Sequence, residues 1–461
     1  MEGIGACRPA ILSFMLICLI CACATAENWP AWRGPDGSGA SADTDLPLHW
    51  SATQNLRWRV PLPDRGNSTP VAWGDRLFIT QAIEADHRRT VMCFARSDGK
   101  LLWQSGVTAA ESEPTNGQNP YCSASPVTDG RRVIAYFGSP GLYCYDYTGK
   151  ELWHRDVGKV DSWQGSGSSP VIYQRLCILN AGPGTQAAVV ACDLDDGHIV
   201  WKVTPPPVIA GAIPGGRPPS KENGHDFDGA MMAADPTGAG GFRGSWSTPV
   251  ILHAADHDEV VVVHPKNVTA YDPATGNEIW TCGGLPEQAF ATPALGEGCL
   301  VATGHRLAGG GTRVTAIKLG GHGDVTATHR LWQIDLPKEC VSSGLITSGR
   351  LYLLTQFGSV ISLDLATGQK KWEHRLSGQG SQAGSWSSLV MANGTLLAPN
   401  HSGEVFVLKA SPEFELLATN WAGEETTCAS LAVSDGMVYL RTYKAICCFG
   451  KDESGSSRGG P

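Results

Sequence analysis

The sequence predicts an all-β protein: an eight-bladed β-propeller closed by the N-terminal strand pairing into the last blade. Three observations predict it: a turn-and-tryptophan motif that recurs along the chain, a Ser/Thr-Pro-Val pattern that precedes each copy, and a tryptophan-bearing strand near the N-terminus with no neighbouring partner. Repeats about 42–56 residues apart are typical of four-stranded propeller blades. The alternative is a β-sandwich with scattered tryptophans, and the regular spacing argues against it.

The clearest copy of the motif runs from Val268 to Trp280. Its first residues alternate as in a strand, Asp272-Pro273-Ala274-Thr275-Gly276 has the composition of a turn, and Ile279-Trp280 supplies the bulky residues of a second strand. Weaker copies end at Trp332 and Trp421. One outer-strand tryptophan is thereby predicted for each blade: Trp58, Trp103, Trp153, Trp201, Trp280, Trp332, Trp372 and Trp421.

The second pattern marks eight starts of inner strands. These are Thr69-Pro70-Val71, Ser125-Pro126-Val127, Ser169-Pro170-Val171, Thr248-Pro249-Val250, Thr292-Pro293-Ala294, Ser343-Gly344-Leu345, Ser388-Leu389-Val390 and Ser430-Leu431-Ala432. No tryptophan-ending strand follows the eighth start. We therefore expect the strand around Trp58 to complete the last blade, beside Tyr439 and Cys448, which would leave no sheet edge open at the junction.

Composition bounds the class of protein. The chain has 461 residues, of which 42% are hydrophobic and 17% charged, with 56 Gly and 29 Pro, as expected of a turn-rich globular β protein. The net charge is −9 and no run of Lys or Arg occurs. Nucleic-acid binding is therefore not expected, because phosphate contacts need clustered cations.

Residues 1–26 are predicted to be a signal peptide that ends in the cleavage site Ala24-Thr25-Ala26, so the protein would be exported, periplasmic or secreted. Alternatively, Ile20-Cys21-Ala22-Cys23 resembles a lipobox, and Cys23 would then be lipidated and hold the chain at a membrane. Of the 15 Cys, 11 lie beyond this segment, and we expect them to pack as small buried side chains rather than as a disulfide framework or a zinc site. The adjacent pair Cys447-Cys448 is expected to face opposite sides of a strand.

The mature chain divides into a leader (27–55), the propeller (56–450) and a Gly/Ser-rich tail (451–461) that we expect to be disordered. In the leader, Trp29 and Trp32 are expected to pin the segment onto the outside of the ring; stacking on a ligand is the alternative.

A ligand site is predicted where the long connection between residues 204 and 244 crosses one face toward the central channel. Within it, Asn223-Gly224-His225-Asp226-Phe227-Asp228-Gly229 is the densest group of potential ligands, although such residues are also ordinary in solvated turns. Inner-strand aromatics are expected to ring the channel mouth, although packing between inner strands would explain them equally well. The candidate lining residues are Trp163, His225, Asp226, Asp228, Arg243, Trp246 and Trp386.

The repeats resemble the pyrroloquinoline-quinone repeat, the tryptophan-docking blade of quinoprotein-type eight-bladed propellers. The family pattern Ala-x-Asp-x-x-Thr-Gly-x-x-x-Trp is matched throughout by Ala270–Trp280, and the resemblance covers about residues 28–449. It implies that each outer-strand tryptophan packs against the neighbouring blade. The segments Asn28–Pro35 and Gly66–Arg76 look like exported propeller proteins of planctomycete-type bacteria.

The resemblance implies two unlike activities. Quinoprotein alcohol and glucose dehydrogenases hold pyrroloquinoline quinone and calcium in the channel, whereas relatives in outer-membrane β-barrel assembly bind no cofactor and act as scaffolds. The calcium-ligand set of the dehydrogenases has no matching context here, and Cys447-Cys448 lies in a strand rather than on a loop over the quinone. The leading hypothesis is a non-catalytic module that binds a protein or small molecule on its loop-bearing face. A dehydrogenase with quinone, calcium and a divergent site, and a lipid-anchored assembly scaffold, are the alternatives.

Overall fold

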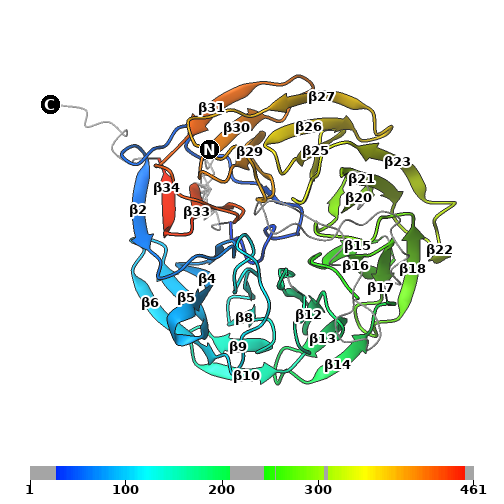
Figure 1. Cartoon of the computed structure of the whole chain (residues 1–461), viewed down its shortest axis with the longest axis horizontal. Coiled ribbons are helices and arrows are strands. Elements are labelled where there is room, and N and C mark those ends of the chain that lie inside the picture. Colours follow the sequence, from blue (N-terminus) through cyan, green and yellow to red (C-terminus); the bar gives the residue numbers. More distant parts are fainter. Residues whose placement is uncertain (1–26, 163, 208–242, 255, 306–309, 452–461) are drawn as a thin grey trace, which may run out of the picture.

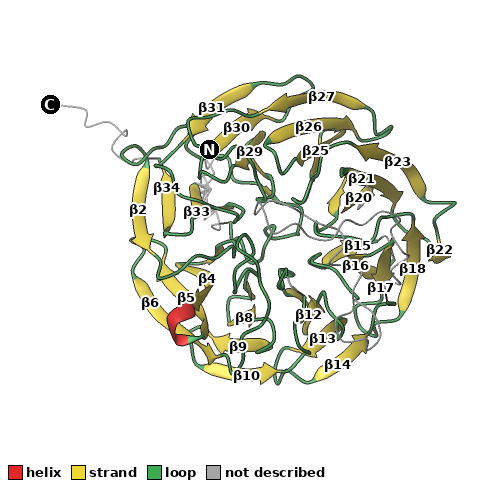
Figure 2. Cartoon of the chain, viewed as in Figure 1, coloured by secondary structure: helices red, strands yellow, loops and turns green. Residues whose placement is uncertain are grey.

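Eight four-stranded antiparallel sheets stand side by side in a closed ring in the computed structural model (Figure 1). The structure describes residues 27–162, 164–207, 243–254, 256–305 and 310–451. Strands account for nearly all regular structure, and the one helical turn among the described residues, η1 (Glu84–Asp86), sits in blade 1 (Figure 2). The predicted eight-bladed propeller is confirmed.

Each blade is numbered from its innermost strand outward. Blade 1 has β3 (Val71–Trp73), β4 (Arg76–Ile83), β5 (Arg88–Ala95) and β6 (Leu101–Thr108). Blade 2 has β7 (Val127–Thr128), β8 (Arg132–Tyr136), β9 (Leu142–Asp146) and β10 (Glu151–Arg155). Blade 3 has β11 (Val171–Tyr173), β12 (Leu176–Ala181), β13 (Ala188–Asp193) and β14 (Ile199–Val203). Blade 4 has β15 (Val250–His253), β16 (Asp258–His264), β17 (Asn267–Tyr271) and β18 (Glu278–Gly283).

The second half of the ring repeats this order. Blade 5 has β19 (Ala294–Gly296), β20 (Cys299–His305), β21 (Thr312–Lys318) and β23 (Arg330–Leu336). Blade 6 has β24 (Leu345–Thr347), β25 (Arg350–Leu354), β26 (Ser359–Asp364) and β27 (Lys370–Arg375). Blade 7 has β28 (Val390–Ala392), β29 (Thr395–Pro399), β30 (Val405–Lys409) and β31 (Leu416–Asn420). Blade 8 has β32 (Ala432–Ser434), β33 (Met437–Arg441), β34 (Ala445–Gly450) and β2 (Leu56–Pro61).

The ring closes between the two ends of the chain. Strand β2 pairs antiparallel with β34, which places Trp58 opposite Cys448 and Arg59 opposite Cys447. Strand β34 in turn pairs with β33, where Cys448 faces Tyr439. The N-terminal strand therefore supplies the fourth strand of blade 8, as the unpartnered tryptophan strand predicted.

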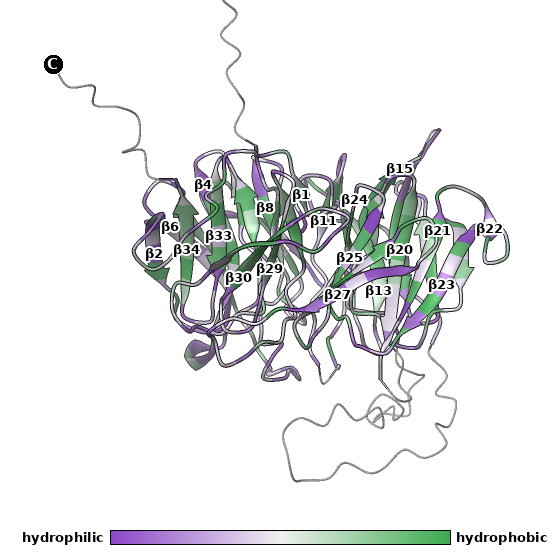
Figure 3. Ribbon diagram, turned by 90° about the horizontal axis from the view of Figure 1, so that it is seen from above, coloured by the Kyte–Doolittle hydropathy of each residue, from purple (hydrophilic) through white to green (hydrophobic). Residues whose placement is uncertain are grey.

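The middle strands of each blade carry the core. Val260 to Val263 of β16 are all fully buried, because both faces of this sheet are covered by neighbouring blades. The apolar strands lie within the disc and the polar connections lie toward its two faces (Figure 3). All eleven cysteines from Cys93 to Cys448 are buried and unpaired, so they pack as small apolar groups.

Six of the outer-strand tryptophans donate a hydrogen bond to the next blade. Their indole N–H groups reach backbone carbonyl oxygens beside the turn between the third and fourth strands, over 2.8–3.2 Å: Trp58 to Arg96, Trp103 to Tyr147, Trp153 to Leu194, Trp201 to Pro273, Trp332 to Leu365 and Trp372 to Pro412. The turn glycine makes room for the ring. A Cβ atom at Gly276 would lie 2.7 Å from the ring of Trp201, and Gly276 has a φ of +73°.

Trp280 and Trp421 depart from this arrangement. The indole of Trp280 donates to the Glu259 carboxyl within its own blade over 2.8 Å. The outer edge of β18, the strand that carries Trp280, is covered by the short strand β22 (Gly323–Asp324). Strand β22 comes from blade 5 and pairs parallel with β18. Trp421 lies beyond β31, donates to Ser402 of its own blade, and leaves Ala418 at the position that a tryptophan occupies in the other blades. The expectation that Trp421 is the outer-strand tryptophan of blade 7 is therefore wrong.

The leader crosses one end of the channel, so the expectation that it packs on the outside of the ring is wrong. Trp29 is fully buried and pairs with Ala72 of blade 1, whereas the Arg33 guanidinium donates to Gly344 O and Leu389 O, which belong to blades 6 and 7, over 2.7 Å each. The leader then adds the short strand β1 (Ala40–Ser41) to the inner edge of β28. Its blue trace passes across the centre of the ring in Figure 1.

Candidate ligand site in the central channel

The predicted Ser/Thr-Pro-Val starts form a ring of hydroxyl groups around the channel. In seven of the eight junctions, the backbone N–H of one start donates to the hydroxyl of the next blade over 2.8–3.0 Å: Thr69 to Ser125, Ser125 to Ser169, Ser169 to Thr248, Thr248 to Thr292, Thr292 to Ser343, Ser343 to Ser388 and Ser388 to Ser430. The eighth junction is open, since Thr69 Oγ1 is buried without a partner among the described residues. These residue types recur because each inner strand needs a short side chain that can accept the neighbouring blade's amide.

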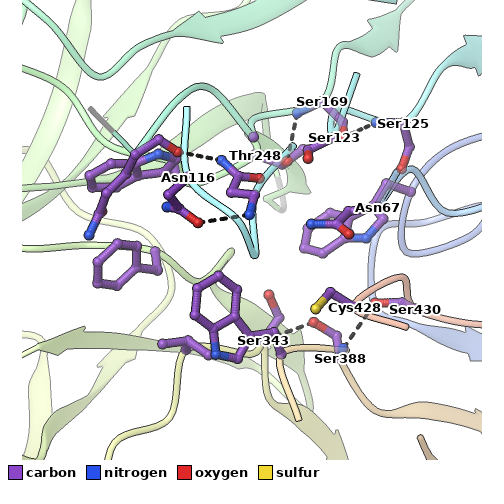
Figure 4. Close-up of a pocket in the computed structure, with 18 residues that line it drawn as sticks. Asn67, Asn116, Ser123, Ser125, Ser169, Thr248, Ser343, Ser388, Cys428 and Ser430 are labelled. Atoms are coloured by element: carbon purple, nitrogen blue, oxygen red, sulfur yellow. Dashed lines mark hydrogen bonds between the residues drawn. The ribbon is translucent and has the colours of Figure 1, made fainter. Parts of the chain in front are cut away.

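A cavity of about 160 Å³ lies inside this ring. Part of its wall comes from the connections that join the outer strand of one blade to the inner strand of the next. We call the side of the disc that carries these connections the loop face, and we call the cavity the cup. Six ring hydroxyls line the cup: Ser125, Ser169, Thr248, Ser343, Ser388 and Ser430. Figure 4 shows them around a common open centre, with the Cys428 sulfur pointing inward between them.

Aromatic side chains contribute the apolar part of the cup wall. Trp246 enters from the connection to blade 4, donates its indole N–H to Gly165 O over 2.9 Å, and stacks on Phe290 with the ring centroids 4.7 Å apart. Trp386 enters from the connection to blade 7 and packs edge-on against the buried His401. Trp32 of the leader lines the cup as well. Aromatic rings from four separate segments therefore converge on one small space.

Side-chain amides supply the polar part of the wall. Asn67, Asn116, Asn119 and Gln164 all line the cup. Asn119 Nδ2 donates to Gln164 O and Ser166 O, which fixes the loop after blade 1 against the loop after blade 2. Gln164 is 6% exposed, and its Oε1, like Asn67 Oδ1, accepts no hydrogen bond from any described group. Buried acceptors are normally satisfied, so these two oxygens call for a donor that the described residues do not supply.

The leader closes the cup at the end opposite the loop face. Trp32 lines both the cup and a second cavity of about 530 Å³, which lies between residues 30–37 and the inner hairpins of blades 1 to 4. Arg33 anchors this floor, and burial lowers its pKa to about 10, so it remains charged at neutral pH. Among the described residues, the leader therefore closes one end of the channel and leaves the cup open toward the loop face.

No described residue that lines the cup carries a formal charge. Two imidazoles behind the cup wall are held neutral by burial, which lowers the pKa of His305, behind Phe290, to about 4 and lowers the pKa of His401. Burial also raises the pKa of the Cys428 thiol to about 12, and its sulfur lies 3.4 Å from His401 Nδ1. A neutral thiol beside a neutral imidazole lacks the thiolate that nucleophilic chemistry requires.

The candidate lining residues fall into three groups. The structure brings Trp246 and Trp386 together in the cup. It places Arg243 elsewhere, bridged to Gly184 with its guanidinium donating to Pro205 O over 3.0 Å, and Arg243 does not line the cup. Trp163, His225, Asp226 and Asp228 lie outside the described residues.

Sequence reasoning missed Phe290 and the four amides, and it gave ligand stacking by Trp32 only as an alternative. Phe290 stands three residues before the inner-strand Pro293, as Trp246 stands three before Pro249, so the spacing itself could have found it. The amides follow no repeat, because each belongs to a connection of different length. Their convergence depends on the closed ring.

Pyrroloquinoline quinone does not fit the described part of the cup. The cofactor is a polyanionic fused-ring molecule, and no described lining residue supplies a cation to pair with it. The cup is also smaller than the roughly 300–1,000 Å³ of pockets for drug-sized ligands. Calcium requires several oxygen ligands, usually including carboxylates, and none of the lining residues is acidic.

A possible metal-binding group lies elsewhere. Asp193, Asp196 and His198 place one ligand atom each within 4.8 Å of one another, at the exposed turn between β13 and β14. Arg175 lies 3.9 Å from Asp193, and the Asp196 carboxylate already bonds His198. The group is a turn with local ion pairs, and it is remote from the cup lining.

Comparison with known proteins places the chain in a family. The family model described as "Outer membrane protein assembly factor BamB" matches residues 87–219 and 264–412, together more than half of the chain. The chain belongs to this family. No curated protein is similar enough in sequence to count as a match.

Solved structures agree with this fold assignment. BamB from Moraxella catarrhalis is similar to 85% of this chain and 98% of its own, with a TM-score of 0.54 and 15% identity. The computationally designed Ika8 protein has a TM-score of 0.51 over 86% of this chain and 99% of its own, with 12% identity. A quinohemoprotein alcohol dehydrogenase from Comamonas testosteroni has a TM-score of 0.44 and 11% identity, over 93% of this chain and 81% of its own. At these identities the likeness to BamB and to Ika8 shows the fold alone.

Proposed function

We propose that this protein is an exported, non-catalytic binding module whose cup, open on the loop face, holds a small molecule or a side chain of a protein partner. The observation that carries the proposal is the character of the cup: aromatic, amide and hydroxyl groups converge in it without a charged group among the described residues. Such a wall can recognise a neutral ligand by stacking and hydrogen bonding. It offers no described general base or ionised nucleophile for a reaction.

The alternative of a dehydrogenase that uses pyrroloquinoline quinone and calcium is tested directly. Purified protein would be unfolded thermally with and without quinone and calcium, and visible absorbance would be followed. The neutral cup supports the expectation that neither the melting midpoint nor the absorbance of the quinone changes. Substrate-dependent electron transfer after reconstitution would overturn the proposal.

The remaining alternative is a lipid-anchored scaffold in outer-membrane protein assembly. Membership of the family described as outer membrane protein assembly factor BamB favours it. The described residues contain no helix with the length and apolar character of a membrane span. Lipidation of Cys23 would anchor the scaffold at a membrane, and mass spectrometry of the mature N-terminus tests it. A diacylglyceryl mass on Cys23 supports the anchored scaffold. A chain that starts at Glu27 supports the free exported form.

A further inference from the structure

We infer that the cup binds an uncharged, polyhydroxylated ring, such as the terminal sugar residue of a neutral glycan. The inference rests on the proposed binding function and specifies its ligand. Three observations carry it: the described residues that line the cup have no charge, its wall offers both hydrogen-bond donors and acceptors, and aromatic surfaces lie on two sides.

The hydrogen-bonding groups suit a ligand that both donates and accepts. The ring hydroxyls Ser125, Ser169 and Ser388 each accept one amide N–H, and no acceptor for their own protons is found among the described residues. Gln164 Oε1 and Asn67 Oδ1 are buried acceptors without a described donor. A sugar hydroxyl can donate to such an amide oxygen and accept from a protein hydroxyl.

The arrangement in space agrees with this chemistry. Asn67 and Asn116 lie on different sides of the open centre, between the labelled Ser and Thr side chains (Figure 4). A ring whose hydroxyl groups project around its rim would therefore meet polar groups on more than one side. An ion would meet no opposite charge on the described wall.

The aromatic groups suit the other surface of a sugar. The stacked pair Trp246 and Phe290 faces the cup from the loops of blades 4 and 5, and Trp386 faces it from the loop of blade 7. The C–H face of a pyranose is apolar, and burying it against an aromatic ring is favourable. Aromatic walls combined with neutral amides therefore favour a sugar over an ion or a purely apolar ligand.

The size of the cup limits the ligand. A volume of about 160 Å³ is roughly that of five water molecules at ~30 Å³ each. A single ring would fill it, and the rest of a longer glycan would extend over the loop face. Free monosaccharides and glycan ends present the same ring chemistry, and comparing monosaccharides with the corresponding disaccharides distinguishes the two sources.

The test is a binding panel with the full exported chain, read by tryptophan fluorescence and by calorimetry. It contains neutral hexoses and pentoses, their disaccharides, the uronic acid of the same ring, aromatic carboxylic acids, short neutral peptides, and the quinone with calcium. We expect saturable binding of a neutral sugar and at least about tenfold weaker binding of the uronic acid, because a carboxylate would be desolvated in the cup without a counter-charge.

Three variants locate the site. Gln164→Ala and Trp386→Phe should each weaken sugar binding by about tenfold, the effect of one lost hydrogen bond or stacking contact in a small site. Trp372→Phe changes a tryptophan on the outer wall and should leave binding unchanged. Thermal unfolding of each variant shows that it is folded, and if Trp386→Phe is not, Gln164→Ala carries the test.

Two outcomes overturn the inference in distinguishable ways. If no neutral sugar binds up to about 10 mM, but another panel member binds and is lost in Gln164→Ala, the ligand class is wrong and the binding function stands. If no panel member responds to either cup variant, the ligand class and the proposed function both fall. A uronic acid that binds more tightly than its neutral parent also refutes the neutral-ring inference.

Discussion

Replacing Gly276 with alanine tests how adjacent blades are held together. The residue has a φ of +73°, and a Cβ atom there would lie 2.7 Å from Cδ2 and Cε3 of Trp201, whose indole also donates to Pro273 O over 2.8 Å. The left-handed conformation costs a residue with a Cβ about 1–2 kcal/mol. Overpacking against the buried ring adds about 1–3 kcal/mol. Gly276→Ala should therefore lower the free energy of unfolding by about 2–5 kcal/mol.

Gly349→Ala is the matched control, because Gly349 has a φ of +69° but no atom lies within 4 Å of its would-be Cβ. It should cost only the conformational term of about 1–2 kcal/mol. Urea unfolding of the two variants and the parent, followed by tryptophan fluorescence, measures the difference. In the double variant Gly276→Ala/Trp201→Leu the clash is removed, so the two effects should be non-additive. Equal midpoints for Gly276→Ala and Gly349→Ala would refute the reasoning that the tryptophan needs the space over the glycine.

Three further predictions follow from buried groups. Burial lowers the pKa of His264 from 6.5 to about 4. The unfolded chain therefore binds the proton more readily, and the contribution of His264 to the free energy of unfolding falls by about 3 kcal/mol between pH 7 and pH 4. The urea midpoint of His264→Gln should vary less than that of the parent over this range, and parallel pH profiles of the two proteins would contradict this. Trp280→Phe leaves the buried Glu259 carboxyl without its indole donor and should cost about 1–3 kcal/mol in calorimetric unfolding, more than Trp332→Phe, whose carbonyl partner lies in a less buried contact. All eleven cysteines of the described chain are buried and unpaired, so a thiol reagent should react with all of them only after denaturation. In the native protein, Cys428, which lines the cup, should react first. Fewer than eleven reactive thiols after denaturation would show a disulfide.

The predictions made from the sequence are wrong at the outer strand of blade 7 and at the leader. In blade 7, Ala418 occupies the position of the expected tryptophan, and Trp421 lies after the strand, in the connection to blade 8. The turn sequence before this strand departs from the motif, so the sequence could not show which residue of the strand takes the tryptophan position. The leader tryptophans were expected outside the ring, but Arg33 finds its acceptors Gly344 O and Leu389 O only across the channel mouth. Those carbonyl oxygens belong to blades that lie far away in the sequence, so no local pattern could reveal them.

The amino-acid sequence by itself determined the architecture: eight starts, their Ser or Thr residues, and the early strand around Trp58 that completes the last blade. These are local patterns, each confined to one hairpin or one strand, and local chemistry decides them. The tertiary structure alone decided the cup, because its aromatic, amide and hydroxyl groups come one or two at a time from separate connections and from the leader. Closing the ring brings these distant segments around a single centre, and the crossing leader closes one end of that centre among the described residues.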